Sequence, residues 1–600
     1  MDDLQKRIFE IENQIAELPQ GYISKKNISG KIRYYHQWTE AGKKKSKYLN
    51  DVAAAALNPL IEKRRALQQE LKTLNGLLPK GFGKIAGSNS QLYETNILTR
   101  SDLKDFIIPV QKYKKRFCFK DLQHYLAGGW QEKVFILYGL RRTGKTTLIR
   151  QAIGEMNAEA FSKTAFIQIR PGDTMAMLNR DLKQLKHNGF QYIFIDEVTF
   201  LEDFIQGAAL FSDIYVAGGM KVILSGTDSL GFLLAEDEQL YDRCVLCHTT
   251  FIPYKEFETV LGIHGIDEYI RYGGTMSLSG QHYNDQSPFA DKKRTDAYVD
   301  SAIAKNIQHS LKNYQDAGHF RHLQDLYEKN ELTGAINRIV EDINHRFTVN
   351  VLTDTFKSHD LGISKRNLRH DREKPTDVLD EIDEETLILR LKTCLEILNK
   401  PEQRVEIQAA HAAEIKEYLE LLDLVAEIPM ETIPVQDDVQ MQTIITQPGL
   451  RYAQVKTLVE QLLMDRRFQT VSAVERAYVC ERILNEVRGR MLEEIILLET
   501  QMAYPNKKVF KLQFAVGEFD MVVADPQNIT CEVYEIKHSK KIIADQYRHL
   551  IDEKKISDTA FRYGNVTKRI VLYRGETDDT RPVSYRNVEE YLMALPDRIL

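Results

Sequence analysis

Hydrophobic positions near both ends of the first 75 residues recur with a helical period. They are Leu4, Ile8, Ile11, Ile15 and Leu18 in the first stretch and Leu57, Ile61, Leu67, Leu71 and Leu74 in the second. Because residues at this spacing share one helix face, we expect two helices that pair as an antiparallel coiled coil. The segment between them alternates apolar and polar residues and has turn residues at 40–42, which predicts a β-hairpin.

From residue 117 onward, short apolar runs alternate with helical stretches. The expected strands are 134–138, 165–169, 192–195 and 221–224, with helices at about 175–185 and from 203. This alternation is typical of a parallel sheet wrapped by helices. Residues 325–430 are helical in pattern, and a last group of strands starts near 508. We predict a multidomain α/β protein whose parts are 1–75, coiled coil with hairpin; 76–116, linker; 117–260, parallel-sheet domain; 261–470, helical region; and 471–600, C-terminal α/β domain.

Composition narrows the class of protein. The 600 residues are 43% hydrophobic and 28% charged, enough apolar material for several cores. No apolar run reaches the roughly 18 residues of a membrane span, and the first residues have no apolar secretory core, so we expect a cytoplasmic protein with no membrane partner. The pattern Cys244, Cys247, His248 matches a haem attachment string, but it lies in an expected strand, which favours core cysteines.

The expected hairpin is strongly basic. Residues 21–49 hold eight basic residues and one acid, a net charge of +7, and five aromatic residues lie among them: Tyr22, Tyr34, Tyr35, Trp38 and Tyr48. Cations beside aromatic rings suit phosphate contacts with base or sugar stacking. The alternative is a solvated hairpin with an aromatic core face. Nucleic acid, with DNA as the preferred kind, is the partner we expect.

A phosphate-binding loop follows the apolar run 134–138. The string GLRRTGKT has the G-x-x-x-x-G-K-[ST] spacing, and a helical run, TTLIRQAI, comes after it. The glycines let backbone N–H groups turn toward an anion, Lys145 reaches the β- and γ-phosphates, and Thr146 offers a hydroxyl to Mg²⁺. ATP and Mg²⁺ are therefore the expected cofactors. The loop residues assigned to the nucleotide are Gly139, Arg142, Thr143, Gly144, Lys145, Thr146 and Thr147.

Two acids end the apolar strand YIFIDE. Here Asp196 is expected in the Mg²⁺ shell, and Glu197 is expected to polarise the attacking water. In the next strand, VILSGTDS, Ser225 or Thr227 is placed to reach the γ-phosphate or the water. The residue Arg243 is a candidate arginine finger, for its own nucleotide or for that of a neighbouring subunit in a homo-oligomer; a surface arginine is the alternative.

Late in the chain, an acid and an E-x-K string follow each other at the distance of a hairpin. The acid is Asp520, in EFDMVVA, and the string in CEVYEIKH supplies Glu535 and Lys537. This arrangement resembles the skeleton of PD-(D/E)xK nucleases. Carboxylates at two adjacent strand ends can converge on Mg²⁺, and a lysine two residues on shares their face, where it can orient water. Gln546, near the next helix, is a further candidate.

Together, these motifs resemble AAA+ ATPases of the AAA_14/DUF4143 type. The strings that carry the resemblance are GLRRTGKTTLIRQ, IFIDEVTFLEDF, VILSGTDSL and YDRCVLCHTTFIPYKEF, followed by RYGG at 271–274, YVDSAI at 298–303 and QPGLR at 447–451. The likeness spans roughly residue 117 to the C-terminus. Thr199 departs from it, where the family has Gln, and so does Asp242, where the family has Gly before the arginine.

The resemblance implies an AAA+ ATPase core at 117–260 and a winged helix in the region 261–470. A helix-turn-helix at 352–369, broken at Gly362, is the candidate for this module, with an acidic stretch at 377–385 after it. The string GRMLEEIILLE resembles the helix that precedes the nuclease strands in this family, and its acid maps onto Glu493, a possible further metal ligand.

Two functions follow from these motifs. The first is an ATP-dependent, Mg²⁺-dependent nuclease coupled to an AAA+ ATPase, in a setting such as bacterial defence or mobile-element biology. The second is a regulatory ATPase switch that assembles with a protein partner, in which the nuclease-like domain is structural. Cleavage of DNA by the purified protein, with Asp520→Ala as control, separates them.

Overall fold

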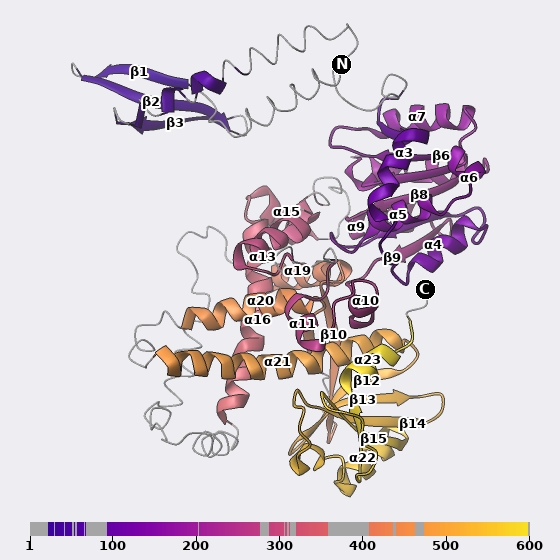
Figure 1. The fold of residues 1–600 in the computed structure, drawn as a ribbon, viewed down its shortest axis with the longest axis vertical. Coiled ribbons are helices and arrows are strands. Elements are labelled where there is room, and N and C mark those ends of the chain that lie inside the picture. The colour runs from indigo at the N-terminus through magenta and orange to yellow at the C-terminus, as the bar shows by residue number, and fades with distance from the viewer. Residues whose placement is uncertain are drawn as a thin grey trace. The chain divides into compact units, whose positions relative to one another are not determined.

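The structure is a computed structural model of the whole chain, and Figure 1 shows its elements. The described residues are 22–28, 31–40, 43–50, 53–54, 57–59, 61–64, 67, 93–201, 203–276, 287–304, 306–308, 311, 320–357, 407–435, 440–462 and 473–597. The chain divides into two compact units, Met1–Gln91 and Leu92–Leu600. Each is described by itself.

The first unit contains a three-stranded antiparallel sheet in place of the expected two-stranded hairpin. Its strands are β1 (Tyr22–Ile28), β2 (Lys31–Glu40) and β3 (Lys43–Leu49), with β2 in the centre. The prediction missed the separation of β1 from β2; Tyr22 pairs with Gln37 and Tyr35 with Tyr48. Most of the expected coiled coil, 1–21 and 68–75, lies outside the described residues.

The first part of the second unit is built on a six-stranded sheet in the order β4-β6-β7-β8-β5-β9. The strands are β4 (Asn96–Thr99), β5 (Val134–Tyr138), β6 (Thr164–Gln168), β7 (Tyr192–Asp196), β8 (Lys221–Gly226) and β9 (Cys244–His248). All pairs are parallel except that of β4 with β6. The expected strands are confirmed, and the central ones are apolar throughout because helices cover both faces.

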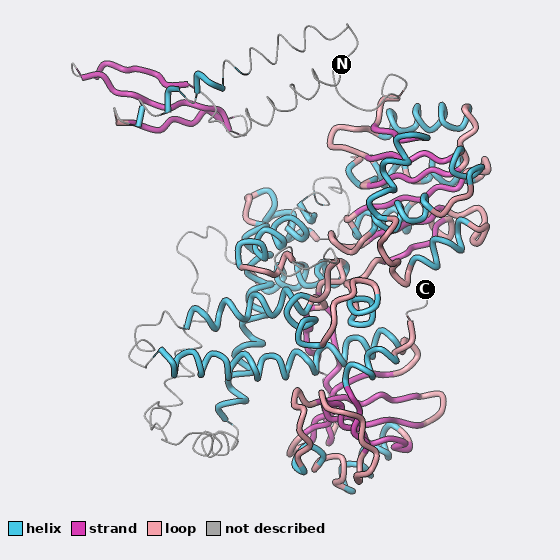
Figure 2. Tube along the Cα trace, viewed as in Figure 1, coloured by secondary structure: helices cyan, strands magenta, loops and turns pink. Residues whose placement is uncertain are grey.

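Alternate side chains of these strands enter two different cores. On one face Phe135, Leu137 and Phe194 pack against helices α3 (Arg100–Ile107), α4 (Phe119–Leu126) and α5 (Lys145–Gly154). On the other face Ile136 and Ile195 pack against α7 (Met175–His187), α8 (Phe204–Gly207) and α9 (Ser229–Glu238). Figure 2 shows this sheet between its helical layers.

The expected linker 76–116 needs a correction in its second half. Strand β4 pairs with β6, from Asn96 opposite Gln168 to Thr99 opposite Ala165, and α3 follows it directly. Residues 93–110 therefore belong to the sheet domain. The polar composition of the segment gave no signal for β4, because a four-residue edge strand needs few apolar residues.

A group of helices follows the six-stranded sheet. They are α10 (Tyr254–Thr259), α11 (Ile266–Tyr272), α13 (Lys292–Val299), α15 (Arg321–Glu328), α16 (Leu332–Lys357), α19 (Ala409–Leu421) and α20 (Pro448–Leu462). Residues of α13, α15, α16 and α19 share one apolar core. Residues 352–357 of the expected helix-turn-helix continue α16, and the remainder, 358–369, lies outside the described residues, as does the acidic stretch 377–385. The winged helix stays a prediction.

The C-terminal sheet has seven strands in the order β11-β10-β12-β13-β14-β15-β16. Its members are β10 (Val425–Ile433), β11 (Gln440–Ile445), β12 (Lys508–Phe514), β13 (Glu518–Asp525), β14 (Thr530–Ile536), β15 (Asn565–Tyr573) and β16 (Ser584–Asn587). Strands β12, β13 and β14 form an antiparallel meander, and β14, β15 and β16 are parallel. Because β10 pairs with β12, this sheet starts before the expected boundary at 471.

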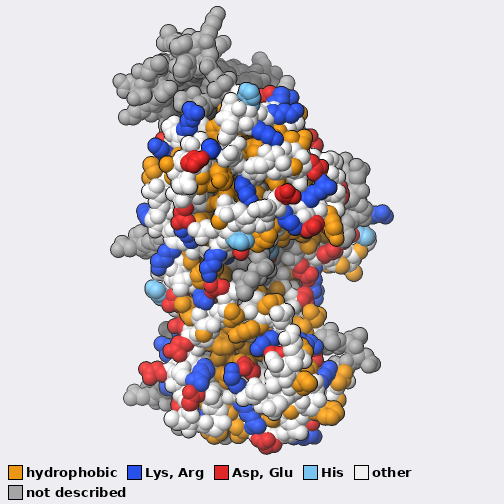
Figure 3. Space-filling view, turned by 90° about the vertical axis from the view of Figure 1, so that its right-hand side faces the viewer, with side chains coloured by type: hydrophobic (Ala, Val, Ile, Leu, Met, Phe, Trp, Pro, Cys, Tyr) orange, Lys and Arg blue, Asp and Glu red, His pale blue; other side chains and the backbone are white. Residues whose placement is uncertain are grey.

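Three helices complete this part of the second unit: α21 (Ala473–Ala503), α22 (Glu553–Tyr563) and α23 (Val588–Ala594). Apolar residues of α21, such as Val487, Met491 and Ile495, share a core with residues of α20 and the sheet. On the described surface seen in Figure 3, Lys and Arg side chains lie among Asp and Glu rather than in a patch of one sign.

Candidate functional site: a phosphate loop and a carboxylate pair

The phosphate loop joins β5 to α5, and its two glycines occupy backbone conformations that other residues rarely adopt. The φ angles are +139° at Gly139 and +92° at Gly144. A Cβ on Gly139 would lie 2.4 Å from the carbonyl oxygen of Thr249, and one on Gly144 would lie 2.4 Å from Sδ of Met276. Only glycine combines these conformations with such close approaches. The loop therefore requires glycine where the motif has it.

Lys145 is the first residue of α5, and its side chain is folded back over the loop. Its Nζ donates to the carbonyl oxygens of Gly139 at 2.7 Å and Leu140 at 2.9 Å. Burial lowers the pKa of the Lys145 ammonium to about 8, against the opposing effect of Glu197 and Asp196. A phosphate at the loop would exchange two neutral acceptors for charged oxygens, which form stronger hydrogen bonds with an ammonium group.

The strand end of β7 brings Asp196 to the start of α5. The Thr146 hydroxyl donates to Asp196 Oδ2 at 2.8 Å, and the Ser225 hydroxyl, from β8, donates to Oδ1 at 2.5 Å. A hydroxyl and a carboxylate in contact at the end of a phosphate loop are the two protein ligands that Mg²⁺ takes in such sites. These residues fit the ion with no further protein ligand.

Glu197 follows Asp196 in a left-handed conformation, with φ at +54°. Its Oε2 accepts a hydrogen bond from the Thr227 hydroxyl at 3.3 Å. Burial raises the pKa of the Glu197 carboxyl, and the Lys145 ammonium opposes this rise. Glu197 therefore has an increased affinity for a proton and lies next to Lys145, the lysine of the loop. A carboxylate in this state suits the role of a general base.

The remaining loop residues take different positions. Arg142 is exposed and has a left-handed φ of +64°, and its carbonyl accepts from the backbone N–H of Met276 at 2.7 Å. Thr143 is buried, and its hydroxyl donates to the Leu140 carbonyl at 2.8 Å. Thr147 is half-buried on α5. All three stay predicted nucleotide contacts.

The structure separates Arg243 from the loop of its own chain. The residue directly precedes β9, whose Cys244 pairs with Val134 at the start of β5, whereas the loop follows the end of β5. Its Nη1 bonds Asp213 Oδ1 at 2.5 Å. Parallel strands carry their two ends to opposite edges of the sheet, so a finger role toward the same chain's nucleotide is wrong. A role in a neighbouring subunit stays a prediction.

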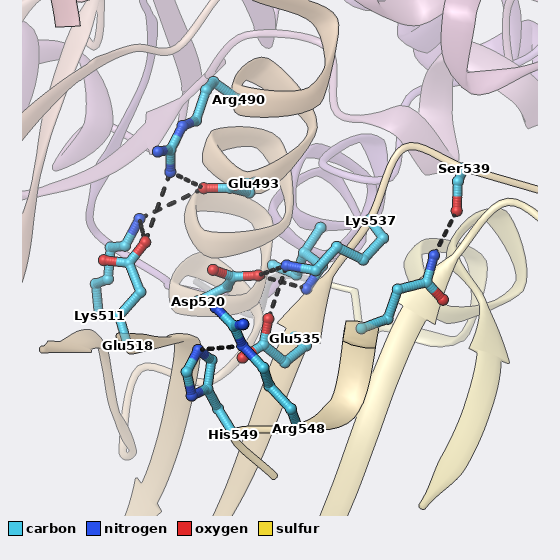
Figure 4. A network of polar contacts seen from close by, with 12 residues as sticks. Arg490, Glu493, Lys511, Glu518, Asp520, Glu535, Lys537, Ser539, Arg548 and His549 are labelled. Atoms are coloured by element: carbon cyan, nitrogen blue, oxygen red, sulfur yellow. Dashed lines mark hydrogen bonds and ion pairs between the residues drawn. The ribbon is translucent and has the colours of Figure 1, made fainter. Parts of the chain in front are cut away.

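In the C-terminal sheet, Asp520 and Glu535 converge on Lys537, as Figure 4 shows. Lys537 Nζ lies 2.9 Å from Asp520 Oδ2 and 2.7 Å from Glu535 Oε2. Asp520 Oδ2 also accepts from the backbone N–H of Ile536 at 2.7 Å. The carboxylates come from the neighbouring strands β13 and β14 and are 3% and 4% exposed, so water reaches little of either.

The environment moves the pKa values of the two acids apart. Burial and the Asp520 charge raise the pKa of Glu535 to about 8. For Asp520, burial favours the neutral acid, but the ammonium groups of Lys537 and Lys511 outweigh it and lower the pKa to about 2. Two carboxyls that differ in this way are characteristic of functional sites, although structural ion pairs produce the same effect.

A second cluster of charges lies beside this pair. Lys511, on β12, is 2.9 Å from Glu518 Oε1 and 3.4 Å from Glu493 Oε2, and Arg490 contacts the same two acids at 3.6 and 3.1 Å. Glu493 thus approaches from α21 but is held by cations (Figure 4). Among the described residues, no three His, Cys, Asp or Glu side chains gather closely enough to hold a metal ion, so Glu493 does not complete a three-acid site.

The carboxylate pair nevertheless fits Mg²⁺. Glu535 Oε1 is buried and has no hydrogen-bond partner among the described residues. An orphaned carboxylate oxygen in a protein interior requires a partner, which a cation supplies. Magnesium commonly takes only one or two protein carboxylates and completes its shell with water and substrate oxygens. Asp520 and Glu535 would supply this number.

Sequence reasoning missed the residues Lys511, Glu518 and Arg490. Two of them had a usable signal: Glu518 is two residues before Asp520, hence on the same face of β13, and Lys511 interrupts the apolar run of β12. The side chain of Gln546 donates to Ser539 Oγ at 2.8 Å and to the Lys541 carbonyl, so its contacts lie in the loop after β14.

Comparison with known proteins identifies two segments. The model of an AAA domain, AAA_14, matches residues 131–258, and the model of a domain of unknown function, DUF6788, matches residues 1–58. A search among curated proteins found no match. Among solved structures, the chain is similar to the Aeropyrum pernix ORC1 protein in complex with DNA, at 14% identity over 60% of this chain and 94% of that chain, with a TM-score of 0.20.

A membrane span is not found: no helix among the described residues is long and apolar enough to cross a bilayer. The matched segment 131–258 holds the phosphate loop, the paired acids and five strands of the six-stranded sheet. This segment is therefore similar to AAA domains, and the similarity includes the phosphate loop and the paired acids.

Proposed function

We propose that the protein is an ATP-dependent, Mg²⁺-dependent nuclease that acts on DNA. The observation that carries the proposal is the convergence of Asp520, Glu535 and Lys537 at adjacent strand ends, with one buried carboxylate oxygen of Glu535 left without a partner among the described residues. Bound Mg²⁺ supplies a Lewis acid for the phosphate and lowers the pKa of water. Asp520 and Glu535 would hold the ion.

In this proposal Lys537 changes partners when substrate binds. Its ammonium lies between the two carboxylates, and both raise its pKa against the effect of burial. A divalent ion would take over neutralisation of the acids, which frees the ammonium to orient the attacking water or bind a phosphate oxygen. Arg548 and His549, which lie near the acids in Figure 4, are further contacts for the substrate.

In this proposal, ATP binding and hydrolysis at the phosphate loop supply the energy for DNA cleavage or determine when it occurs. Lys145 and the backbone of the loop would bind the phosphates of ATP, Thr146 and Asp196 would hold Mg²⁺, and Glu197 would accept the proton of the attacking water. Thr227 would keep Glu197 in place through its hydrogen bond at 3.3 Å. Lys145 and Glu197 thus have separable roles, in binding and in hydrolysis.

A short segment, 266–276, connects the two sites and supports their coupling. At one end Asp267, on α11, accepts from His538 Nε2 at 2.9 Å and from Arg574 Nη2 at 2.6 Å, and His538 directly follows Lys537. At the other end the N–H of Met276 donates to the carbonyl of Arg142 in the phosphate loop at 2.7 Å. A rearrangement of the loop on nucleotide binding would reach the nuclease-like site through eleven residues.

The basic sheet of the first unit is the proposed nucleic-acid contact. Eight basic residues in 21–49, with a net charge of +7, would release counterions from DNA on binding. Deletion of residues 1–91 is expected to weaken DNA affinity and to flatten its dependence on salt. An unchanged salt slope would make this segment a solvated surface. Figure 3 shows charges of both signs intermixed on the described surface in view, so the basic sheet is the better candidate.

The test of nuclease function is cleavage of linear and single-stranded DNA by the full-length protein with ATP and Mg²⁺. Cleavage should be lost in Asp520→Ala, Glu535→Gln and Lys537→Ala, whose ATP hydrolysis should stay at the wild-type rate. The control is Glu532→Gln, a change on the same strand at a carboxylate that pairs with Lys568. Equal cleavage by wild type and all three variants would assign the activity to a contaminant and refute the proposal.

One observation favours the alternative, a regulatory ATPase switch. The acids of the C-terminal site already have cations of the chain as partners: Lys537 for Asp520 and Glu535, and Lys511 for Glu493 and Glu518. A site neutralised in this way can be purely structural. In that case the protein, in the cytoplasm, would assemble as a homo-oligomer or with a protein partner when ATP binds, and light scattering with and without ATP would detect the change.

A further inference from the structure

Residues 112–116, with the sequence KYKKR, form a basic run, yet its last residue, Arg116, does not belong to the surface. Its side chain is 6% exposed. Lys115, its neighbour in the run, is 37% exposed and pairs with Glu155. A buried arginine is costly unless every donor is satisfied, so its contacts reveal what it does.

The guanidinium of Arg116 joins three segments. Its Nε donates to Glu256 Oε2, on α10, at 2.7 Å, and Nη2 lies 2.6 Å from the same oxygen. Its Nη1 donates to the carbonyl of Thr143, in the phosphate loop, at 2.8 Å and to that of Thr250 at 3.1 Å. Nη2 also donates to the carbonyl of Phe251 at 3.3 Å. The guanidinium of Arg116 therefore links the phosphate loop, the segment that follows β9 and helix α10.

Glu256 fixes the arginine in this position. The carboxylate is 2% exposed, and its second oxygen accepts from the backbone N–H of Phe117 at 2.6 Å. Both oxygens therefore have donors, and the ion pair is fully satisfied. A planar guanidinium with donors on several sides can serve a carboxylate and three carbonyls together, whereas the compact ammonium of lysine cannot.

The bond to Thr143 determines the direction of the next peptide N–H. A trans peptide is planar, with its C=O and the following N–H pointing in opposite directions. Since Arg116 holds the carbonyl of Thr143, the N–H of Gly144 points away from the arginine. In phosphate loops the backbone N–H groups at this place are the ones that bind the phosphates.

We propose that Arg116 is a positioning residue for nucleotide binding, which holds the peptide between Thr143 and Gly144 in the orientation that a triphosphate requires. It contacts no reacting atom and acts through the loop. The proposal rests on nucleotide binding at this loop but not on nuclease activity. It also assigns the buried pair with Glu256 a role in the site rather than in general stability.

The experiment compares four full-length variants with the wild type: Arg116→Lys, Arg116→Ala, Glu256→Gln and the matched control Lys115→Gln. ATP hydrolysis is measured over a range of ATP concentrations, a fluorescent ATP analogue gives Kd, and thermal unfolding monitors the fold. Arg116→Lys should raise KM and Kd about tenfold, because charge-assisted hydrogen bonds to the loop are lost, while kcat changes less than about threefold.

The other three variants test the same bond in independent ways. Glu256→Gln retains a hydrogen-bond acceptor but not the charge and should raise KM by less than Arg116→Lys does, and Lys115→Gln should match the wild type. In Arg116→Ala, added guanidinium ion at low millimolar concentration should restore part of the affinity, which it cannot do for an unfolded protein.

Several outcomes would overturn it. If Arg116→Lys lowered kcat with KM unchanged, the preparation would contain fewer folded molecules, and the role would be structural. If both Arg116 variants bound the analogue like the wild type, or if Arg116→Ala were insensitive to guanidinium, the loop would not depend on the arginine. Failure of the wild type to bind the analogue would instead contradict nucleotide binding itself.

Discussion

The phosphate loop and the carboxylate pair are constructed in different ways. The loop is almost continuous in sequence: its glycines, its lysine and its threonine lie within 139–146, and the backbone supplies most of the site. The carboxylate pair joins side chains of two strands, 15 residues apart, and charges from β12 and α21 surround it. A backbone site is specified by local conformation, whereas a site of opposed side-chain charges is specified by which elements the fold brings together.

The two sites therefore respond differently to the loss of one residue. In the loop the backbone groups remain when a side chain is removed. In the C-terminal cluster every charge has another as its partner, so a single removal leaves an uncompensated buried charge. The following predictions test this contrast, from the largest expected effect to the smallest.

Replacing Lys145 by alanine should have the largest effect. The variant should lose ATP binding and hydrolysis by about 100-fold or more, equal to about 2.7 kcal/mol, because the only lysine of the loop is removed. Cleavage of DNA in the absence of ATP should stay at the wild-type level, since the carboxylate pair is intact. Isothermal titration with ATP and a cleavage assay measure the two effects. Retention of tight ATP binding would contradict the role of Lys145.

Glu197→Gln should separate binding from hydrolysis. The change keeps the shape of the side chain and its bond with Thr227 but removes the base, so hydrolysis should fall about 100-fold while the Kd for ATP changes less than about threefold. Single-turnover hydrolysis of radiolabelled ATP gives the rate. An unaltered rate would remove Glu197 from catalysis and leave Asp196 or Thr227 to position the water.

Asp267→Asn should loosen the connection between the two sites. Loss of the charge weakens the bonds to His538 and Arg574, which we expect to reduce the stimulation of cleavage by ATP about tenfold. ATP hydrolysis alone and ATP-free cleavage should each stay near the wild-type rate. The neighbouring change Glu268→Gln serves as the control. If both variants kept full stimulation, coupling would follow another route through the second unit.

The smallest effect on activity is expected at Glu499, on α21, whose Oε1 accepts from the backbone N–H of Tyr254 at 2.8 Å. Burial raises the pKa of this carboxyl to about 7. The folded protein therefore keeps a proton that the unfolded chain releases above about pH 4.3, so the free energy of unfolding falls as pH rises from there to about 7.

Glu499→Gln should remove this pH dependence. The destabilisation that it relieves amounts to about 4 kcal/mol at most above pH 7, because the pKa differs by about 2.7 units between the two states and one pKa unit corresponds to about 1.4 kcal/mol. Urea unfolding at several pH values from 4.5 to 8.5 measures it. If the unfolding free energy of the wild type rose over this pH interval by the same amount as that of Glu499→Gln, Glu499 would be ionised in the folded state.

The sequence by itself predicted the phosphate loop and the strands β5 to β9 and β12 to β14, but it did not predict β4, β10, β11, β15 or β16. An apolar strand before G-x-x-x-x-G-K-T predicts the loop, because few other roles demand glycine and lysine at that spacing. Strands β7 and β12 lie where their apolar runs predicted them. Asp520 and Glu535 could be named because an acid followed by an E-x-K string resembles the skeleton of PD-(D/E)xK nucleases, and the two-residue spacing puts Lys537 on the same strand face as Glu535.

Tertiary structure alone decided the partners of these residues. Four of the five residues 112–116 are basic, yet the fold buries Arg116 against Glu256, 140 residues away, and leaves Lys115 on the exterior. Similarly, Arg243 lies at the far edge of its sheet, and Lys511 and Arg490 reach Glu493 through packing of α21 on β12. Charge pairing between distant segments follows from how layers pack, and no local periodicity in a single sequence encodes it.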